Sequence, residues 1–130
     1  MNDANYEWLF LIPKGWTQIA QQIIEECEAI EPNYTIADMK EKWGELRVVS
    51  YIPDKEGWPT PSDHADELIE IEDKYTEQST RTCCRCGKLA TKYSTDWILP
   101  WCDNCGTEEY GSYKEFNHDS TATNNNRKRI

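Results

Sequence analysis

The sequence predicts an α+β fold class, with two helices against a small antiparallel sheet and a cysteine-rich module at the C-terminal end. Apolar residues recur at helical spacing over positions 16–30. A run rich in β-branched and aromatic residues follows at positions 46–52. Two C-x₂-C pairs lie between positions 83 and 105. These patterns divide the chain into an α+β domain at 1–80, a cysteine module at 81–116, and a polar tail at 117–130 that we expect to be disordered.

The composition favours a small folded protein. Of the 130 residues, 38% are apolar, and six Trp and seven Tyr are among the side chains available for a core. No run approaches the roughly 18 apolar residues that a membrane-spanning helix needs, and the run from Trp8 to Ile12 is too short for the core of a signal peptide. We therefore expect a cytoplasmic protein that does not engage a membrane.

The charge is strongly acidic and unevenly distributed. The formal net charge is −10, and residues 1–82 carry 18 Asp and Glu against 7 Lys and Arg. This acidity opposes general nucleic-acid binding, which depends on neutralising phosphates, so we expect nucleic acid to be an unlikely partner. The acidity is compatible with solubility alone or with attraction to a basic partner surface.

The first element, residues 6–12, is a short apolar run stopped by Pro13-Lys14-Gly15, and we expect a strand or an extended segment there. The first helix is the clearest element, and Pro32 ends it. Its inward positions are Trp16, Ile19, Ala20, Ile23, Ile24, Cys27 and Ile30.

A β-hairpin is expected over residues 34–52. Its first arm runs from Tyr34 to Met39, its turn lies near Trp43-Gly44, and its second arm runs from Leu46 to Ile52. Residues 53–61 hold three prolines and a glycine, so we expect a loop.

The second helix is expected over residues 61–79, with Thr60 as its cap and Pro61 at its first position. Its apolar stripe is narrow, and the rest of its surface is acidic. The acidic positions are Asp63, Asp66, Glu67, Glu70, Asp73 and Glu77.

The paired cysteines indicate a metal site. Fifteen residues separate the C-x₂-C pair Cys83/Cys86 from the pair Cys102/Cys105. A two-residue gap lets both thiolates of a pair reach one tetrahedral ion, so these four residues are predicted to hold one Zn²⁺. Cys84 would leave only one residue before Cys86, and we expect it to pack beneath the site or to be a spare thiol. Cys27 is expected to be a buried small apolar residue.

Four thiolates close the coordination sphere, so the zinc is predicted to be structural rather than catalytic. Residues 89–101 are expected to form a hairpin, and residues 106–116 have helical content. A helix after the second pair would define a treble clef, whereas a second hairpin would define a zinc ribbon. The segment resembles GATA-type fingers, in which Cys102-Asp103-Asn104-Cys105-Gly106 would open the helix. The basic contact residues of that family are largely missing, so its DNA binding is not expected.

Two surfaces are candidate binding sites. Lys40, Lys42, Trp43 and Arg47 form the basic-aromatic cluster of the acidic half. They are either a hairpin with a core Trp and paired bases, or a recognition patch for an anionic or protein ligand. On the second helix, Asp66, Glu67, Glu70 and Asp73 are either a solvated face or an anionic face that occupies a basic cleft.

Over residues 13–106 the chain resembles small uncharacterised proteins of phages and their bacterial hosts. The shared features are the Gly15-Trp16 pair before a helix, the K-x-K-W-G-x-L-R hairpin, the acidic helix and the terminal double C-x₂-C. The resemblance implies a phage-associated setting, with action in the host cytoplasm, and implies no activity.

Three function hypotheses follow. The leading one is a small non-enzymatic zinc-binding protein that binds a host or phage partner protein, as an accessory or counter-defence factor. The second is a nucleic-acid or nucleotide binder that uses Lys40, Lys42, Trp43 and Arg47. The third is an enzyme built on a treble clef, although His64 and His118 are the only histidines and neither lies in a motif.

Overall fold

The computed structural model describes residues 3–95, 97–109 and 114–115. The first part of the chain comprises α1 (Asp3–Glu7), the 3₁₀ turns η1 (Trp8–Leu11) and η2 (Lys14–Trp16), α2 (Thr17–Ile30), β1 (Thr35–Lys42), β2 (Glu45–Pro53), β3 (Pro59–Thr60) and α3 (Ala65–Ser79). The second part comprises β4 (Lys92–Tyr93), β5 (Pro100–Trp101), α4 (Asp103–Glu109) and β6 (Lys114–Glu115). Within these ranges, every helix is too short or too polar to cross a membrane.

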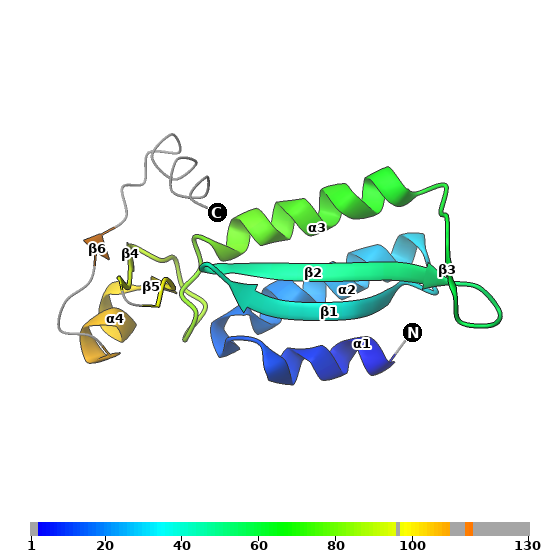
Figure 1. Ribbon diagram of the computed structural model, residues 1–130. Helices are drawn as coiled ribbons and strands as arrows, with labels where there is room; N and C mark the ends of the chain where they lie inside the picture. The colour runs from blue at the N-terminus through cyan, green and yellow to red at the C-terminus, as the bar shows by residue number, and fades with distance from the viewer. Residues whose placement is uncertain (1–2, 96, 110–113, 116–130) are drawn as a thin grey trace.

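The strands form two small sheets. The first has the order β1-β2-β3 and the second has the order β5-β4-β6, and all their pairings are antiparallel. In Figure 1 the long β1–β2 hairpin lies in front of α2, with α3 along one side and α1 along the other. The second sheet and α4 lie at the end of the molecule where the hairpin turns. The cysteine module therefore abuts the hairpin turn.

The core is continuous from the helices into the cysteine module. α2 buries Ile19, Ala20, Ile23, Ile24 and Cys27, which confirms the helix expected over residues 16–30 and the buried position of Cys27. The same cluster of buried side chains includes Trp16, Met39 and Leu46, and it extends to Cys83, Cys84, Trp101 and Cys102. Because a small domain buries few apolar groups, this shared cluster makes the module part of one core.

The hairpin is confirmed, and its turn lies where the sequence predicts it. Lys42 pairs with Glu45, which leaves Trp43 and Gly44 as the two central residues. Both have positive φ, 58° at Trp43 and 83° at Gly44. Such a two-residue turn matches the right-handed twist of the strands it joins. Glycine accepts this conformation without cost, whereas a large aromatic residue does not.

The expectation of a strand at residues 6–12 is wrong. Helix α1 and the 3₁₀ turn η1 occupy this region, and Asn5 docks them on the edge of β1. The Asn5 side chain accepts a hydrogen bond from Ile36 N at 2.8 Å and donates one to Tyr34 O at 2.8 Å. A short apolar run has no periodicity that separates a strand from a helix, and here the docking of Asn5 decided the outcome.

The loop and helix boundaries after the hairpin also differ from the prediction. The expected loop at residues 53–61 contains β3, which pairs Thr60 with Ile52 and so recruits the residue expected to cap a helix. α3 starts at Ala65 rather than at position 61, because residues 61–64 form a turn in which Ser62 Oγ accepts a hydrogen bond from His64 N at 3.0 Å. The pairing of Thr60 with Ile52 thus took the place of the capping role that the sequence pattern predicted.

In the cysteine module, the hairpin expected over residues 89–101 is present as the β4–β5 pair. The helical content expected over 106–116 is present only in part, because α4 ends at Glu109 and residues 114–115 pair with β4 as β6. The predicted disordered tail at 117–130 and the predicted module end at 116 lie outside the described residues.

Candidate metal centre and adjoining groove

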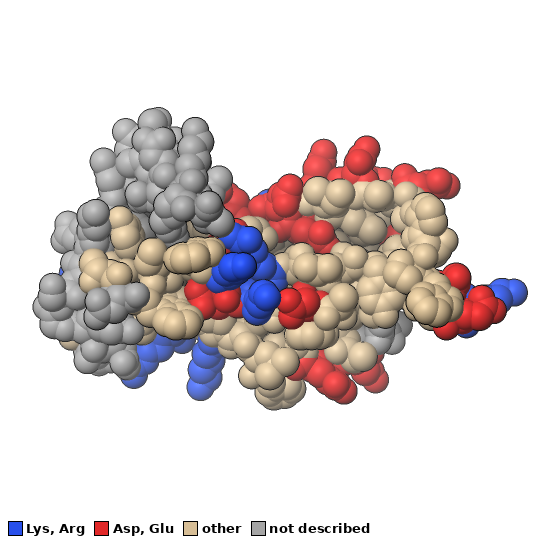
Figure 2. Space-filling model, viewed as in Figure 1, with Lys and Arg blue, Asp and Glu red and all other residues tan. Residues whose placement is uncertain are grey.

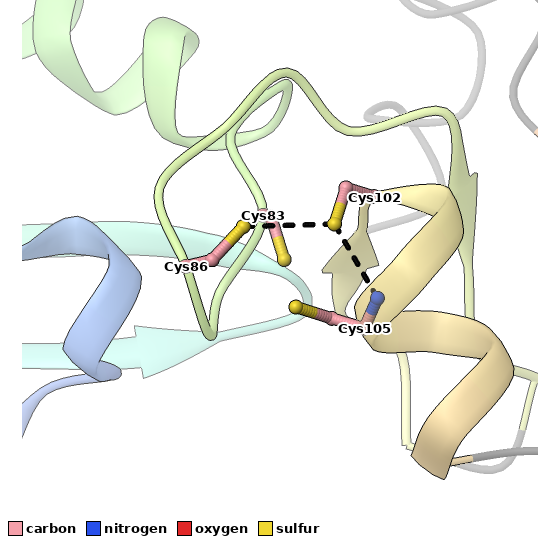
Figure 3. Close-up of side chains that lie close together, drawn as sticks. All are labelled: Cys83, Cys86, Cys102 and Cys105. Carbon is pink, nitrogen blue, oxygen red and sulfur yellow. Dashed lines mark hydrogen bonds between the residues drawn. The ribbon is translucent and has the colours of Figure 1, made fainter.

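The four predicted cysteines lie together in two pairs. Cys83 and Cys86 lie on the loop that follows α3, and Cys102 and Cys105 lie at the start of α4, so that the four sulfurs point toward one another (Figure 3). One ligand atom from each residue lies within 4.8 Å of all the others, and Cys86 Sγ is 3.5 Å from Cys102 Sγ. All four are free thiols rather than disulfides.

These distances fit a metal–thiolate centre. Four thiolates about 2.3 Å from a tetrahedral ion lie about 3.8 Å from one another. The observed sulfur separations bracket that spacing, so the four side chains can close on one ion without movement of the backbone. A group of four sulfur donors with no oxygen or nitrogen donor favours soft or borderline divalent ions.

The backbone around Cys83 prepares its thiol for ionisation. Burial opposes the charged form, but backbone N–H groups of Cys86, Cys102 and Arg85 point at the sulfur and lower the Cys83 pKa to about 7. At the neighbouring Cys84 burial outweighs the hydrogen bonding, and it raises the pKa of that thiol to about 12. Cys84 therefore stays a neutral thiol in the core beneath the site.

The first cysteine loop is seated on the turn before α2. Gly15 N donates a hydrogen bond to Cys84 O at 2.8 Å, and Trp16 Nε1 donates one to Thr82 O at 2.9 Å. A Cβ at Gly15 would lie 2.0 Å from Cys83 O, so only glycine lets the two backbones approach this closely. The Gly15-Trp16 pair thus holds the metal loop against the main core.

A groove of about 520 Å³ lies where the hairpin turn meets the module. Its lining residues are Lys40, Glu41, Lys42, Trp43, Trp97 and Ile98. Glu41 joins the two sides of this Trp43/Trp97 groove: its carboxylate accepts a hydrogen bond from Trp97 Nε1 at 3.1 Å and another from Gly44 N at 3.0 Å. Even so, 49% of Trp43 and 64% of Trp97 remain exposed.

The loop that carries Trp97 is held by a buried serine. Ser94 Oγ accepts hydrogen bonds from Leu99 N at 3.2 Å and from Trp101 Nε1 at 3.3 Å, and its hydroxyl donates to Trp97 O. Since Trp101 directly precedes Cys102 of the candidate metal site, the groove wall and that site belong to one packed unit.

The predicted basic-aromatic cluster is brought together only in part. Lys40, Lys42 and Trp43 line the groove, but Arg47 does not. Arg47 lies opposite Lys40 on β2, and its Nε is 2.8 Å from Glu45 Oε2. Lys40 is 3.4 Å from Asp38 and remains exposed.

The acidic residues form a separate surface on α3. Asp66, Glu67, Glu70 and Asp73 are all exposed. Figure 2 shows acidic side chains along α3, and basic side chains gathered near the hairpin turn. His64 lies beside this face, where Nδ1 is 2.9 Å from Glu67 Oε1. The other histidine, His118, lies outside the described residues.

Glu41, Trp97 and Ile98 are the groove residues that sequence reasoning did not select as a binding site. Trp97 links the module to the hairpin through Glu41 while leaving most of its surface exposed. The available signal was a tryptophan in the connection of a short hairpin, a position where burial is uncommon.

Comparison of the chain with protein-family models, with curated protein sequences and with solved structures returned no significant match.

Proposed function

We propose that this is a non-enzymatic protein that captures a partner protein at the Trp43/Trp97 groove, with one structural Zn²⁺ holding the groove in shape. The observation that carries the proposal is the composite origin of the groove. One tryptophan comes from the hairpin turn and the other from the cysteine module, and both are exposed, although Glu41 links Trp97 to Gly44, the residue next to Trp43. Exposed Trp is the residue type most enriched at binding hot spots.

The conformation of Trp43 supports a binding role. A φ of 58° is strained for a bulky side chain, and Asn or Gly would occupy the same turn position with less strain. A residue that is 49% exposed in a strained turn position gains only part of the burial that a tryptophan side chain can supply to a fold. We infer that Trp43 is retained for the contact it makes with a partner.

The proposed metal is zinc, in a treble-clef arrangement. The all-thiolate donor set supports Zn²⁺, and the arrangement of hairpin, second cysteine pair and helix α4 supports the treble clef over the ribbon. Four protein ligands fill a tetrahedral sphere and leave no position for water or substrate, which supports a structural role. Bound zinc would join the β5–α4 segment to the loop after α3.

Elemental analysis of the purified protein tests the metal assignment. We expect about one zinc per chain. An absence of zinc after expression in zinc-containing medium, or a disulfide between any two of Cys83, Cys86, Cys102 and Cys105, would refute it.

Site-specific photo-crosslinking tests the partner-binding function. A photo-reactive amino acid replaces Lys42 at the groove rim, and in a matched control it replaces the exposed Lys55 of the loop between β2 and β3. In lysate of the native host cell we expect protein conjugates from position 42 and not from position 55. Conjugates to nucleic acid alone would support the nucleotide-binding alternative, and turnover of a nucleotide or nucleic-acid substrate would overturn the non-enzymatic proposal.

A further inference from the structure

The Trp43/Trp97 groove runs along the last residues of an outer strand. β1 is the outermost strand of its sheet, and three consecutive residues of β1, at positions 40–42, line the groove. Because successive side chains of a strand point to opposite faces, a groove lined by consecutive residues lies against the edge of the strand. A strand edge offers N–H and C=O groups that pair with an added strand.

The other half of this edge is closed. There Asn5 accepts a hydrogen bond from Ile36 N and donates one to Tyr34 O, and both α1 and η1 pack against β1. The stretch left for an added strand is therefore short and consists of the groove-lining residues 40–42. A stretch of this length can pair with a linear segment of a few residues, but it is too short to pair with the edge strand of another sheet.

The chemistry of the walls defines what such a segment carries. Trp43, Trp97 and Ile98 form an apolar surface between β1 and the module loop, which accepts an apolar side chain. The exposed Lys42, and the exposed Lys40, which is 3.4 Å from Asp38, flank it and supply the positive charge that attracts carboxylates. Glu41 also belongs to this lining, and each of its two oxygens accepts one hydrogen bond from within the protein.

We propose that the groove binds an extended acidic peptide segment of a partner protein, which adds as a strand beside β1 and places one apolar side chain between Trp43 and Trp97. The proposal rests on the proposed function and names the chemistry of the partner. Strand addition combines main-chain hydrogen bonds, which give affinity, with side-chain pockets, which give specificity.

A single-stranded nucleic acid is the less favoured occupant. Its binding needs a positively charged groove that follows several phosphates. Here two lysines stand beside Glu41 on a chain of net charge −10. The long-range field thus disfavours a polyanion, whereas a segment with one or two carboxylates needs only the two lysines.

The test starts from a displayed library of random twelve-residue peptides, screened against the full-length zinc-loaded protein. We expect enriched sequences to combine Asp or Glu with a large apolar residue and to lack Pro at the centre. The best sequence is then synthesised, together with a version whose alternate backbone amides are N-methylated. Loss of binding on methylation is expected for strand addition, because methylation removes the main-chain donors.

Protein variants locate the binding site. Trp43→Ala and Trp97→Ala are each expected to weaken peptide binding by at least about tenfold. Trp58→Ala provides the matched control, because Trp58 is 70% exposed in the loop at the other end of the hairpin. Lys42→Glu is expected to weaken binding in a salt-sensitive way, whereas Lys55→Glu is not. Circular dichroism and zinc content confirm that each variant is folded.

The outcomes separate this inference from the proposed function. No enrichment of peptides, enrichment of basic or uncharged sequences, or equal weakening by Trp43→Ala and Trp58→Ala would overturn the inference. Preferential binding of a labelled oligothymidylate over every acidic peptide would also overturn it. If position 42 nevertheless gives protein conjugates in lysate, partner binding stands and only the acidic-peptide assignment fails.

Discussion

At the scale of single residues, the proposed binding role of Trp43 conflicts with the stability of the turn. The residue occupies a turn position with φ of 58°, where the backbone favours Asn or Gly. Natural proteins keep such strained residues mainly where a site needs them. The balance between the two roles can be measured by substitution.

Trp43→Asn is expected to raise the free energy of unfolding by about 0.5–1 kcal/mol, because Asn adopts the left-handed conformation more readily. The same variant is expected to lose peptide or partner binding. Chemical denaturation monitored by circular dichroism measures the first effect. A loss of more than about 1 kcal/mol would mean that the indole ring holds the hairpin and the module together, which would make Trp43 a structural residue.

The cysteines offer a second residue-scale prediction. Cys84→Ala is expected to leave the zinc content unchanged, because Cys84 lies outside the cluster of four sulfurs and burial keeps its thiol neutral with a pKa of about 12. Cys102→Ala is expected to abolish stoichiometric zinc. Elemental analysis of the two variants side by side makes the comparison, and equal loss from both would place Cys84 among the ligands.

At the scale of elements, the contact between η2 and the first cysteine loop decides how the module is attached. Gly15→Ala is expected to destabilise the protein by more than about 3 kcal/mol, because the added Cβ meets backbone that cannot move aside. Gly57→Ala is the matched control: nothing lies within 4 Å of its added Cβ, and only the positive φ of 93° opposes it, at about 1–2 kcal/mol. Equal effects from the two would mean that the module moves freely away from η2.

The contact between α2 and α3 predicts a pH dependence. The Tyr75 hydroxyl, followed by Lys74 Nζ at 3.3 Å, donates to Glu26 and holds the pKa of that carboxyl below its usual range. A lowered pKa in the folded state means that the contribution to stability is present above the unfolded value of about 4.3 and is lost as the pH falls through the folded value.

Glu26→Gln is therefore expected to lower stability near neutral pH and to approach the wild type as the solution is acidified. Denaturation curves at several pH values measure the difference. Glu25→Gln, on the exposed side of the same helix, serves as the control. A gap between Glu26→Gln and wild type that stays constant down to acid pH would contradict the assignment.

At the scale of the whole molecule, the candidate metal site and the core share one cluster of buried side chains. Cys83 and Cys102 belong to the same buried cluster as Trp16 and the inward face of α2. Removal of zinc by a strong chelator is therefore expected to reduce hydrogen-exchange protection in α2 as well as in the module. Protection in α2 that is unchanged in the metal-free protein would show that the first part folds by itself, as the sequence-based division at residue 80 implies.

The sequence by itself determined those features that depend on neighbours in the chain. Helical periodicity placed α2, the run from Leu46 to Ile52 and the Trp43-Gly44 turn placed the hairpin, and cysteine spacing selected the four clustered thiols. Each of these patterns acts over a few residues, where propensity and spacing suffice.

Only the tertiary structure decided which distant segments meet. It joined Asn5 to the edge of β1, drew Thr60 into a strand, and brought Trp97 beside the hairpin turn although Glu41, its partner, is 56 residues away. Such contacts depend on how whole elements pack around a common core. The conformational preferences of short sequence segments do not determine that packing. The groove is therefore a property of the folded chain, since neither of its two walls is a site alone.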